Sequence, residues 1–123
     1  MQLLPGECVI EVEGLAPLLL HGDTLCTGDH AYQAFRRQAR NPDWQASMLG
    51  QPLAVRRQFA AAARAHSAHH VAMSAAAIMD VAPDAVAAAY ARHGVRRMIH
   101  GHTHRPAIHT AAAATGPVER IVL

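Results

Sequence analysis

The sequence has 123 residues, of which 51% are hydrophobic and 16% are charged, and its formal net charge is +2. This length accommodates one modest domain, and the hydrophobic fraction excludes a wholly disordered chain. The small net charge gives no indication of nucleic-acid binding, and the apolar runs are too short to cross a membrane. Ten histidines are the most informative feature of the composition, because imidazole is a common metal ligand. Cys8 and Cys26 have no metal-type spacing, which indicates a reduced, cytoplasmic setting.

The N-terminal part of the chain predicts two strands and the start of a helix. Residues 7–12 combine β-branched and charged residues, and Glu13-Gly14 follows them as a turn signal. Leu18 to Leu20 is a short apolar run that is typical of a buried strand. It ends at His21-Gly22-Asp23, in the position where α/β folds usually place their functional residues. Asp29 is placed to cap a helix.

The middle of the chain predicts three helical segments. Pro42 interrupts the helix that begins after Asp29. A second segment runs from Pro52 toward Ala77; it is rich in alanine and arginine, and it resembles an inserted helix more than a core element. Pro83 to Arg92 predicts a further helix, which Gly94 is placed to end.

The C-terminal part predicts three strands, at residues 95–99, 107–110 and 118–123. Residues 111–117 are expected to form the turn between the last two of these strands. The order is therefore two strands, several helices and three strands. This order predicts a mixed α/β fold with a helical excursion.

Two short motifs carry candidate metal ligands. In an extended segment the side chains alternate between faces, so His102 and His104 in Gly101-His102-Thr103-His104 are predicted to point the same way and to hold a metal together. His21 follows a predicted buried strand. Each motif alone is a weak signal, since a surface strand explains many His-x-His pairs, and a histidine after three leucines is more often a hydrogen-bonded edge residue than a ligand.

Four segments resemble those of a known family in both sequence and spacing. They are Leu-Leu-Leu-His-Gly-Asp-Thr-Leu-Cys-Thr at 18–27, Tyr-Gln-Ala-Phe-Arg at 32–36, Ile-Met-Asp-Val at 78–81 and Ile-His-Gly-His-Thr-His-Arg-Pro at 99–106. The sequence resembles, over essentially its whole length, the bacterial UDP-2,3-diacylglucosamine pyrophosphatases of the calcineurin-like metallophosphoesterase superfamily. The resemblance implies that residues 1–123 are the C-terminal portion of a metallophosphoesterase sandwich, with a helical lid inserted at about residues 29–80.

The resemblance also implies roles for individual residues. His21 and His102 would bind one metal ion, and His104 would bind the other. Asp29 and Ser67 would contact the substrate, as would His102, which also lies near the scissile phosphate and is the expected catalytic residue. Family members are hydrolases that use two manganese ions (Mn2+), which bind phosphate oxygens and lower the pKa of a bound water. They cleave the pyrophosphate of UDP-2,3-diacylglucosamine into UMP and 2,3-diacylglucosamine 1-phosphate during lipid A biosynthesis.

The sequence departs from the family in two respects. The Asp-x-His, Gly-Asp and Gly-Asn-Arg-Asp motifs have no counterpart, and Met1 aligns with the interior of a family member. Imidazoles alone make a poor dinuclear manganese cage, so a complete site is expected to need a separate N-terminal half. Many relatives place an asparagine and a lysine where this chain has Val71 and Ser74. This change should weaken the grip on the substrate unless His69, His70 or a nearby arginine substitutes.

The resemblance makes the helical insertion a lid whose apolar side holds acyl chains. Its arginines at positions 56, 57 and 64 would then meet anionic headgroups, which places the protein peripherally on the cytoplasmic face of the bacterial inner membrane; an ordinary solvated face is the alternative. Two other functions also remain open. One is a non-catalytic fragment with a residual metal site, and the other is a phosphodiesterase of the same superfamily that acts on another substrate.

Overall fold

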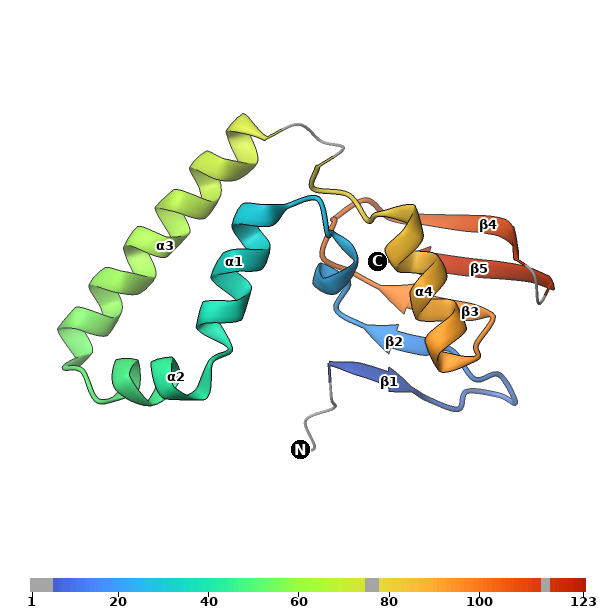
Figure 1. The fold of residues 1–123 in the computed structure, drawn as a ribbon, viewed down its shortest axis with the longest axis horizontal. Coiled ribbons are helices and arrows are strands. Elements are labelled where there is room, and N and C mark those ends of the chain that lie inside the picture. Colours follow the sequence, from blue (N-terminus) through green and yellow to red (C-terminus); the bar gives the residue numbers. More distant parts are fainter. Residues whose placement is uncertain (1–5, 75–77, 114–115) are drawn as a thin grey trace. The chain divides into compact units, whose positions relative to one another are not determined.

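The computed structural model describes residues 6–74, 78–113 and 116–123. The chain divides into two compact units. The first unit is Met1–Gly28 with Asp80–Leu123, and the second is Asp29–Met79. The first unit is a sheet with a helix packed on it, and the second is a succession of three helices (Figure 1). No helix within the described residues is both long enough and apolar enough to cross a membrane.

The first unit contains a five-stranded sheet in the order β1-β2-β3-β5-β4. The strands are β1 (Glu7–Val9), β2 (Leu18–Leu20), β3 (Arg97–His100), β4 (Ala107–Ala113) and β5 (Gly116–Val122). The three central strands are parallel to one another, and the edge strands β1 and β4 are antiparallel to their neighbours. Helix α4 (Pro83–His93) packs against this sheet and ends at Gly94, which adopts the left-handed conformation expected of a C-terminal stop. The predicted mixed α/β fold and the order of its elements are confirmed.

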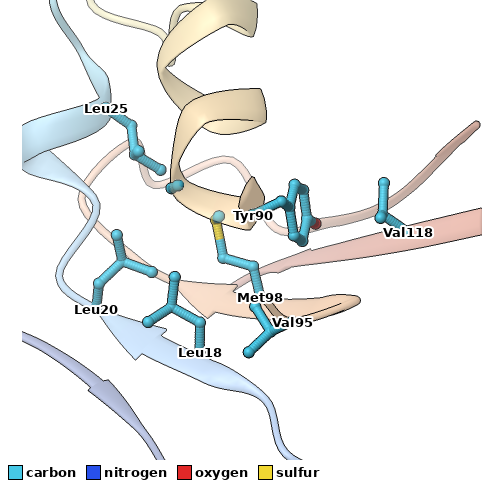
Figure 2. Packing of buried hydrophobic residues seen from close by; sticks show 8 residues of the cluster. Leu18, Leu20, Leu25, Tyr90, Val95, Met98 and Val118 are labelled. Carbon is cyan, nitrogen blue, oxygen red and sulfur yellow. The ribbon is translucent and has the colours of Figure 1, made fainter. Parts of the chain in front are cut away.

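The core of the first unit lies between α4 and the central strands. Its buried members are Leu18, Leu20, Leu25, Ala89, Tyr90, Val95, Met98 and Val118. Leu18 and Met98 are register partners on β2 and β3 and are both fully buried, and Figure 2 shows the Met98 side chain pointing toward α4. The Tyr90 hydroxyl donates a hydrogen bond to the carbonyl oxygen of Glu119 at 2.7 Å, so the one polar atom of this side chain is satisfied.

Strand boundaries differ from the sequence prediction at the C-terminal hairpin. Residues 111–117 were expected to form a turn, but Ala111–Ala113 continue β4, and Gly116 and Pro117 begin β5. The ladder extends as far as the Ala113–Gly116 pair. Alanine has a low intrinsic preference for strands, but pairing of its backbone with β5 overrides that preference. The prediction of a long turn is therefore wrong.

The second unit consists of α1 (His30–Ala39), α2 (Pro42–Leu49) and α3 (Leu53–Met73). As predicted, Asp29 caps α1, where its Oδ1 accepts a hydrogen bond from the Tyr32 N–H at 3.0 Å. Helix α1 ends at Ala39, ahead of Pro42, and Pro42 is the first residue of α2, a helix that the sequence pattern did not predict. Helix α3 was expected to run toward Ala77. It ends at Met73, and Ser74 has an extended backbone; residues 75–77 lie outside the described part of the chain.

The buried pair Leu18–Met98 gives a test of this core. Replacing Leu18 with alanine should lower the free energy of unfolding by about 2–5 kcal/mol, because the change leaves a cavity in a close-packed interior. Leu15→Ala is the matched control, since the Leu15 side chain is exposed and its contacts to Val12 are made by the backbone. Chemical denaturation of both variants measures the difference. Equal losses would contradict the assignment of Leu18 to the core.

A cluster of charges joins β1 to the end of α4. Glu7 Oε2 lies 2.8 Å from His93 Nε2 and 3.0 Å from Arg92 Nη2. The hydrogen bond from His93 and those from Arg92 lower the pKa of Glu7 below its ordinary value, although partial burial opposes them. The ionised carboxylate is therefore the form that the folded state favours.

This pKa shift predicts an acid-sensitive contribution to stability. Because the pKa of Glu7 is lower in the folded state, its contribution is present above the ordinary value of 4.5 and is lost as the pH falls through the lower, folded value. Glu7→Gln should therefore destabilise the protein at pH 7 and flatten the acid limb of its stability profile. Urea denaturation across this pH range measures both effects, with the exposed Glu11→Gln as the control. A variant that kept the full acid dependence would contradict this role.

Candidate functional site

Parallel strands β2 and β3 bring two of the predicted site residues together. Leu20 pairs with His100, so the next residues, His21 and Gly101, leave the sheet at the same edge. The Gly101 N–H donates a hydrogen bond to the His21 carbonyl oxygen at 3.0 Å. The Nδ1 atom of His102 then lies 3.3 Å from the Nε2 atom of His21, with the ring centroids 5.0 Å apart. Two imidazoles that are remote in sequence thus meet at the carboxyl ends of adjacent parallel strands.

The segment that carries His102 and His104 is not extended. The expectation of an extended segment, in which the two side chains point the same way by alternation, is therefore wrong. Strand β3 ends at His100, and both His102 (φ 69°) and His104 (φ 52°) have left-handed backbones. The reason is topological: β4 lies on the far side of β5, so residues 101–106 must carry the chain across rather than prolong β3. Alternation between faces therefore does not relate the two side chains, and the role of His104 as a ligand stays a prediction.

The chemistry of the histidine pair fits part of a metal site. Two imidazole nitrogens bound at about 2.1 Å to one tetrahedral cation lie roughly 3.4 Å apart, close to the spacing found between His21 and His102. Within residues 6–74, 78–113 and 116–123, however, no group of three or more histidine, cysteine, aspartate or glutamate side chains is arranged to hold a metal. The pair suits two ligands of one cation. The described residues do not by themselves fit a dinuclear manganese centre, which prefers oxygen donors.

An ion pair connects the end of the histidine segment to the Ile78–Val81 motif. Arg105 Nη1 lies 2.8 Å from Asp80 Oδ2, and Asp80 Oδ1 accepts the Val81 N–H at 2.7 Å. Burial alone would raise the pKa of Asp80. The hydrogen bonds from Val81 and Arg105 lower this pKa and together outweigh burial, so the pKa of the carboxyl lies below its ordinary value. Asp80 therefore holds the segment that follows His104, a role that the sequence alone did not indicate.

In the second unit, the predicted substrate residue Asp29 is paired with a histidine. His70 Nε2 lies 3.0 and 3.1 Å from the two carboxylate oxygens of Asp29, whose side chain is only 9% exposed. The same carboxylate caps α1, so it joins the start of α1 to the last turns of α3. Ser67 lies on an exposed face of α3. The sequence carries no signal for the Asp29–His70 pair, because the two residues are 41 positions apart.

Ser74 completes a serine–histidine–aspartate cluster that lacks the geometry of a nucleophilic triad. Its Oγ is 3.3 Å from both Nδ1 and Nε2 of His70, so the hydroxyl is not aligned with either ring nitrogen. Nε2 already faces Asp29. A serine nucleophile needs a base nitrogen directed at its hydroxyl and a carboxylate on the other nitrogen. The cluster is therefore a structural link and not a nucleophilic site.

These features define a mixed α/β protein with an imidazole pair at the C-terminal edge of its parallel strands. No family model matches the chain. The chain is 56% identical over 121 residues, 98% of its length, to the UDP-2,3-diacylglucosamine hydrolase of Cellvibrio japonicus (strain Ueda107), and covers 50% of that protein. It is 51% identical over its full length to the UDP-2,3-diacylglucosamine hydrolase of Serratia proteamaculans (strain 568), and 49% identical to that of Shigella dysenteriae serotype 1 (strain Sd197). It covers 51% of each of these proteins.

The chain is thus homologous, along its whole length, to UDP-2,3-diacylglucosamine hydrolases, and the predicted resemblance is confirmed. It spans about half the length of the curated relatives that it matches.

The Asp29–His70 link can be tested within the second unit. His70→Ala should destabilise the helices by about 1 kcal/mol, because it removes a partner from a mostly buried carboxylate. Amide hydrogen exchange should show faster exchange at Tyr32, whose N–H depends on the position of the Asp29 side chain. His69→Ala is the matched control, since it removes an exposed histidine from the adjacent position of the same helix. Indistinguishable variants would show that the link contributes nothing.

Proposed function

We propose that this chain is part of a hydrolase that cleaves the pyrophosphate of UDP-2,3-diacylglucosamine. Water adds to the phosphorus nearer the uridine, the bond from that phosphorus to the bridging oxygen breaks, and the products are UMP and 2,3-diacylglucosamine 1-phosphate. The single observation that carries the proposal is the His21–His102 pair, at the strand edge of a chain whose homologues are named for this substrate. The strand edge of the first unit would carry the reacting phosphate.

The chain's contribution to the proposed site is its imidazoles. His21 and His102 would share one divalent cation, and His104 would serve a second. Two manganese ions would polarise the phosphate when bound, but the remaining donors, above all carboxylates, would come from a separate N-terminal half. His102 would also lie near the scissile phosphate. The close contact between the two rings, 3.3 Å between nitrogens, supports binding of one shared cation rather than two independent surface histidines.

The proposed substrate grip lies in the second unit. Asp29 and Ser67 would contact the substrate, and His70 would add a polar contact in place of the lysine that the family resemblance implies near Ser74. The His70–Asp29 bond supports this substitution, because it holds an imidazole beside the proposed binding carboxylate. A phosphodiesterase with another substrate is the alternative that the changed positions 71 and 74 favour.

We further propose that α3 rests on the inner-membrane surface, where it admits the acyl chains. Exposed apolar side chains at Leu53, Val55, Val71 and Met73 accompany the arginines of the same helix. Apolar side chains can enter the acyl boundary, while guanidinium groups meet anionic headgroups. This combination supports peripheral attachment to an anionic membrane surface, which the family resemblance implies is the cytoplasmic face of the inner membrane.

The experiment combines the 123-residue chain with an N-terminal half that carries the Asp-x-His, Gly-Asp and Gly-Asn-Arg-Asp motifs. With Mn2+ and UDP-2,3-diacylglucosamine, the mixture should release UMP. His102→Ala should reduce the rate more than about 100-fold, since loss of a ligand should exceed the effect of losing an outer-shell partner. His109→Ala, an exposed histidine on β4, should leave the rate unchanged. Absence of UMP release by the folded mixture would refute the proposal, and release from plain nucleotide diesters alone would favour the alternative substrate.

A further inference from the structure

The buried end of β3 holds a histidine that no predicted site includes. His100 is completely buried, and its backbone is fixed because the Leu123 N–H donates a hydrogen bond to its carbonyl oxygen at 2.9 Å. Its Nε2 lies 3.0 Å from Arg120 Nη1, and its Nδ1 lies 2.9 Å from the Gly101 carbonyl oxygen. Both ring nitrogens therefore face protein groups, so His100 is not available as a metal ligand.

The partners of His100 determine its tautomer. An arginine guanidinium has only donors, so Nε2 must accept the bond from Arg120 and carries no hydrogen. The remaining ring hydrogen is then on Nδ1, where it is donated to the Gly101 carbonyl oxygen. A neutral imidazole with its hydrogen on Nδ1 satisfies both neighbours at once, as a buried polar side chain requires.

The ring of His100 contacts both turns that carry the histidine pair. Gly101 precedes His102, and its N–H is bonded to the His21 carbonyl oxygen. On the other side, Gly22 follows His21 and approaches so closely that a Cβ atom there would lie 2.7 Å from His100 Nδ1 and 2.9 Å from the Gly101 carbonyl oxygen. Gly22 also has φ 105°, which side-chain-bearing residues rarely adopt. One imidazole thus contacts the residue beside each ligand candidate.

We propose that His100 is a positioning residue, which holds the His21 and His102 rings in contact through its Nδ1–H bond to Gly101 and its packing against Gly22. The purpose of this arrangement rests on the proposed function, but the arrangement itself does not. Arg120 acts indirectly: its guanidinium donates a hydrogen bond to Nε2 of His100, which keeps the ring hydrogen on Nδ1.

Two amide substitutions separate the roles of the ring nitrogens. His100→Asn places an amide N–H close to the position of Nδ1 and can keep the bond to Gly101. His100→Gln reaches the position of Nε2 and loses that donor, and His100→Leu loses both. The readouts are the tautomer, taken from long-range proton–nitrogen NMR correlations of the histidine rings, and the nuclear Overhauser effect between the His21 and His102 rings. Both are recorded on the 123-residue chain without metal.

The wild-type chain should show the Nδ1–H tautomer at His100 and an Overhauser effect between the two rings. We expect the effect to persist in His100→Asn and to be lost in His100→Gln and His100→Leu. If His100 only supports the fold, the effect would instead follow the unfolding midpoints of the variants. Gly22→Ala is a second test that keeps His100: the added Cβ should abolish the effect while the Nδ1–H tautomer remains.

An Nε2–H tautomer in the wild-type chain, or an undiminished effect in both His100→Leu and Gly22→Ala, would overturn the inference. These readouts need neither metal nor substrate. If the mixture of halves releases no UMP, the proposed function is refuted and this inference stands. If UMP is released but the tautomer or the Overhauser effect differs from the expected result, this inference is refuted and the proposed function stands.

Discussion

The in-register parallel pairing of β2 with β3 is the constraint on which the first unit depends. Leu18 and Met98 face each other in the core, and two residues later Leu20 pairs with His100. Register in a half-buried strand is strongly specified, because a slip of one residue would turn the apolar side chains away from α4. The register that buries Leu18 and Leu20 therefore also places His21 and the Gly101–His102 turn at the same edge of the sheet.

The helical unit is joined to this framework between β2 and α4 and has its own internal links. Asp29 caps α1 and pairs with His70 near the end of α3, so one carboxylate organises two helices. The rings of Trp44 and Phe59 add a packing contact between α2 and α3, with centroids 5.4 Å apart. The strand pairing does not depend on the detailed sequence of these helices, since the chain leaves after β2 and returns before α4. Changes at Val71 and Ser74 can thus alter a proposed substrate grip without disturbing the histidine pair.

The donor chemistry of the strand edge would meet only part of the proposed metal centre. His21 and His102 would supply nitrogen to the proposed centre, whereas a dinuclear manganese centre would also need several oxygen donors. The polar network behind the pair is complete in itself, because His100 has both nitrogens satisfied and Asp80 holds Arg105. The described residues therefore order the edge, while the proposed dinuclear centre would need further oxygen donors.

Local physics made much of this protein predictable from its sequence: the apolar run at Leu18–Leu20, the cap at Asp29 and the stop at Gly94 act over a few residues, and the motifs at His21 and His102 marked the strand edge. The left-handed backbones of His102 and His104 were not predictable, because these residues lie in the connection from β3 past β5 to β4, and that strand order is not visible in the sequence. The pairs Asp29–His70 and His100–Arg120 were also invisible in the sequence. Their members are far apart along the chain, and only the packing of whole elements decides which buried polar groups become neighbours.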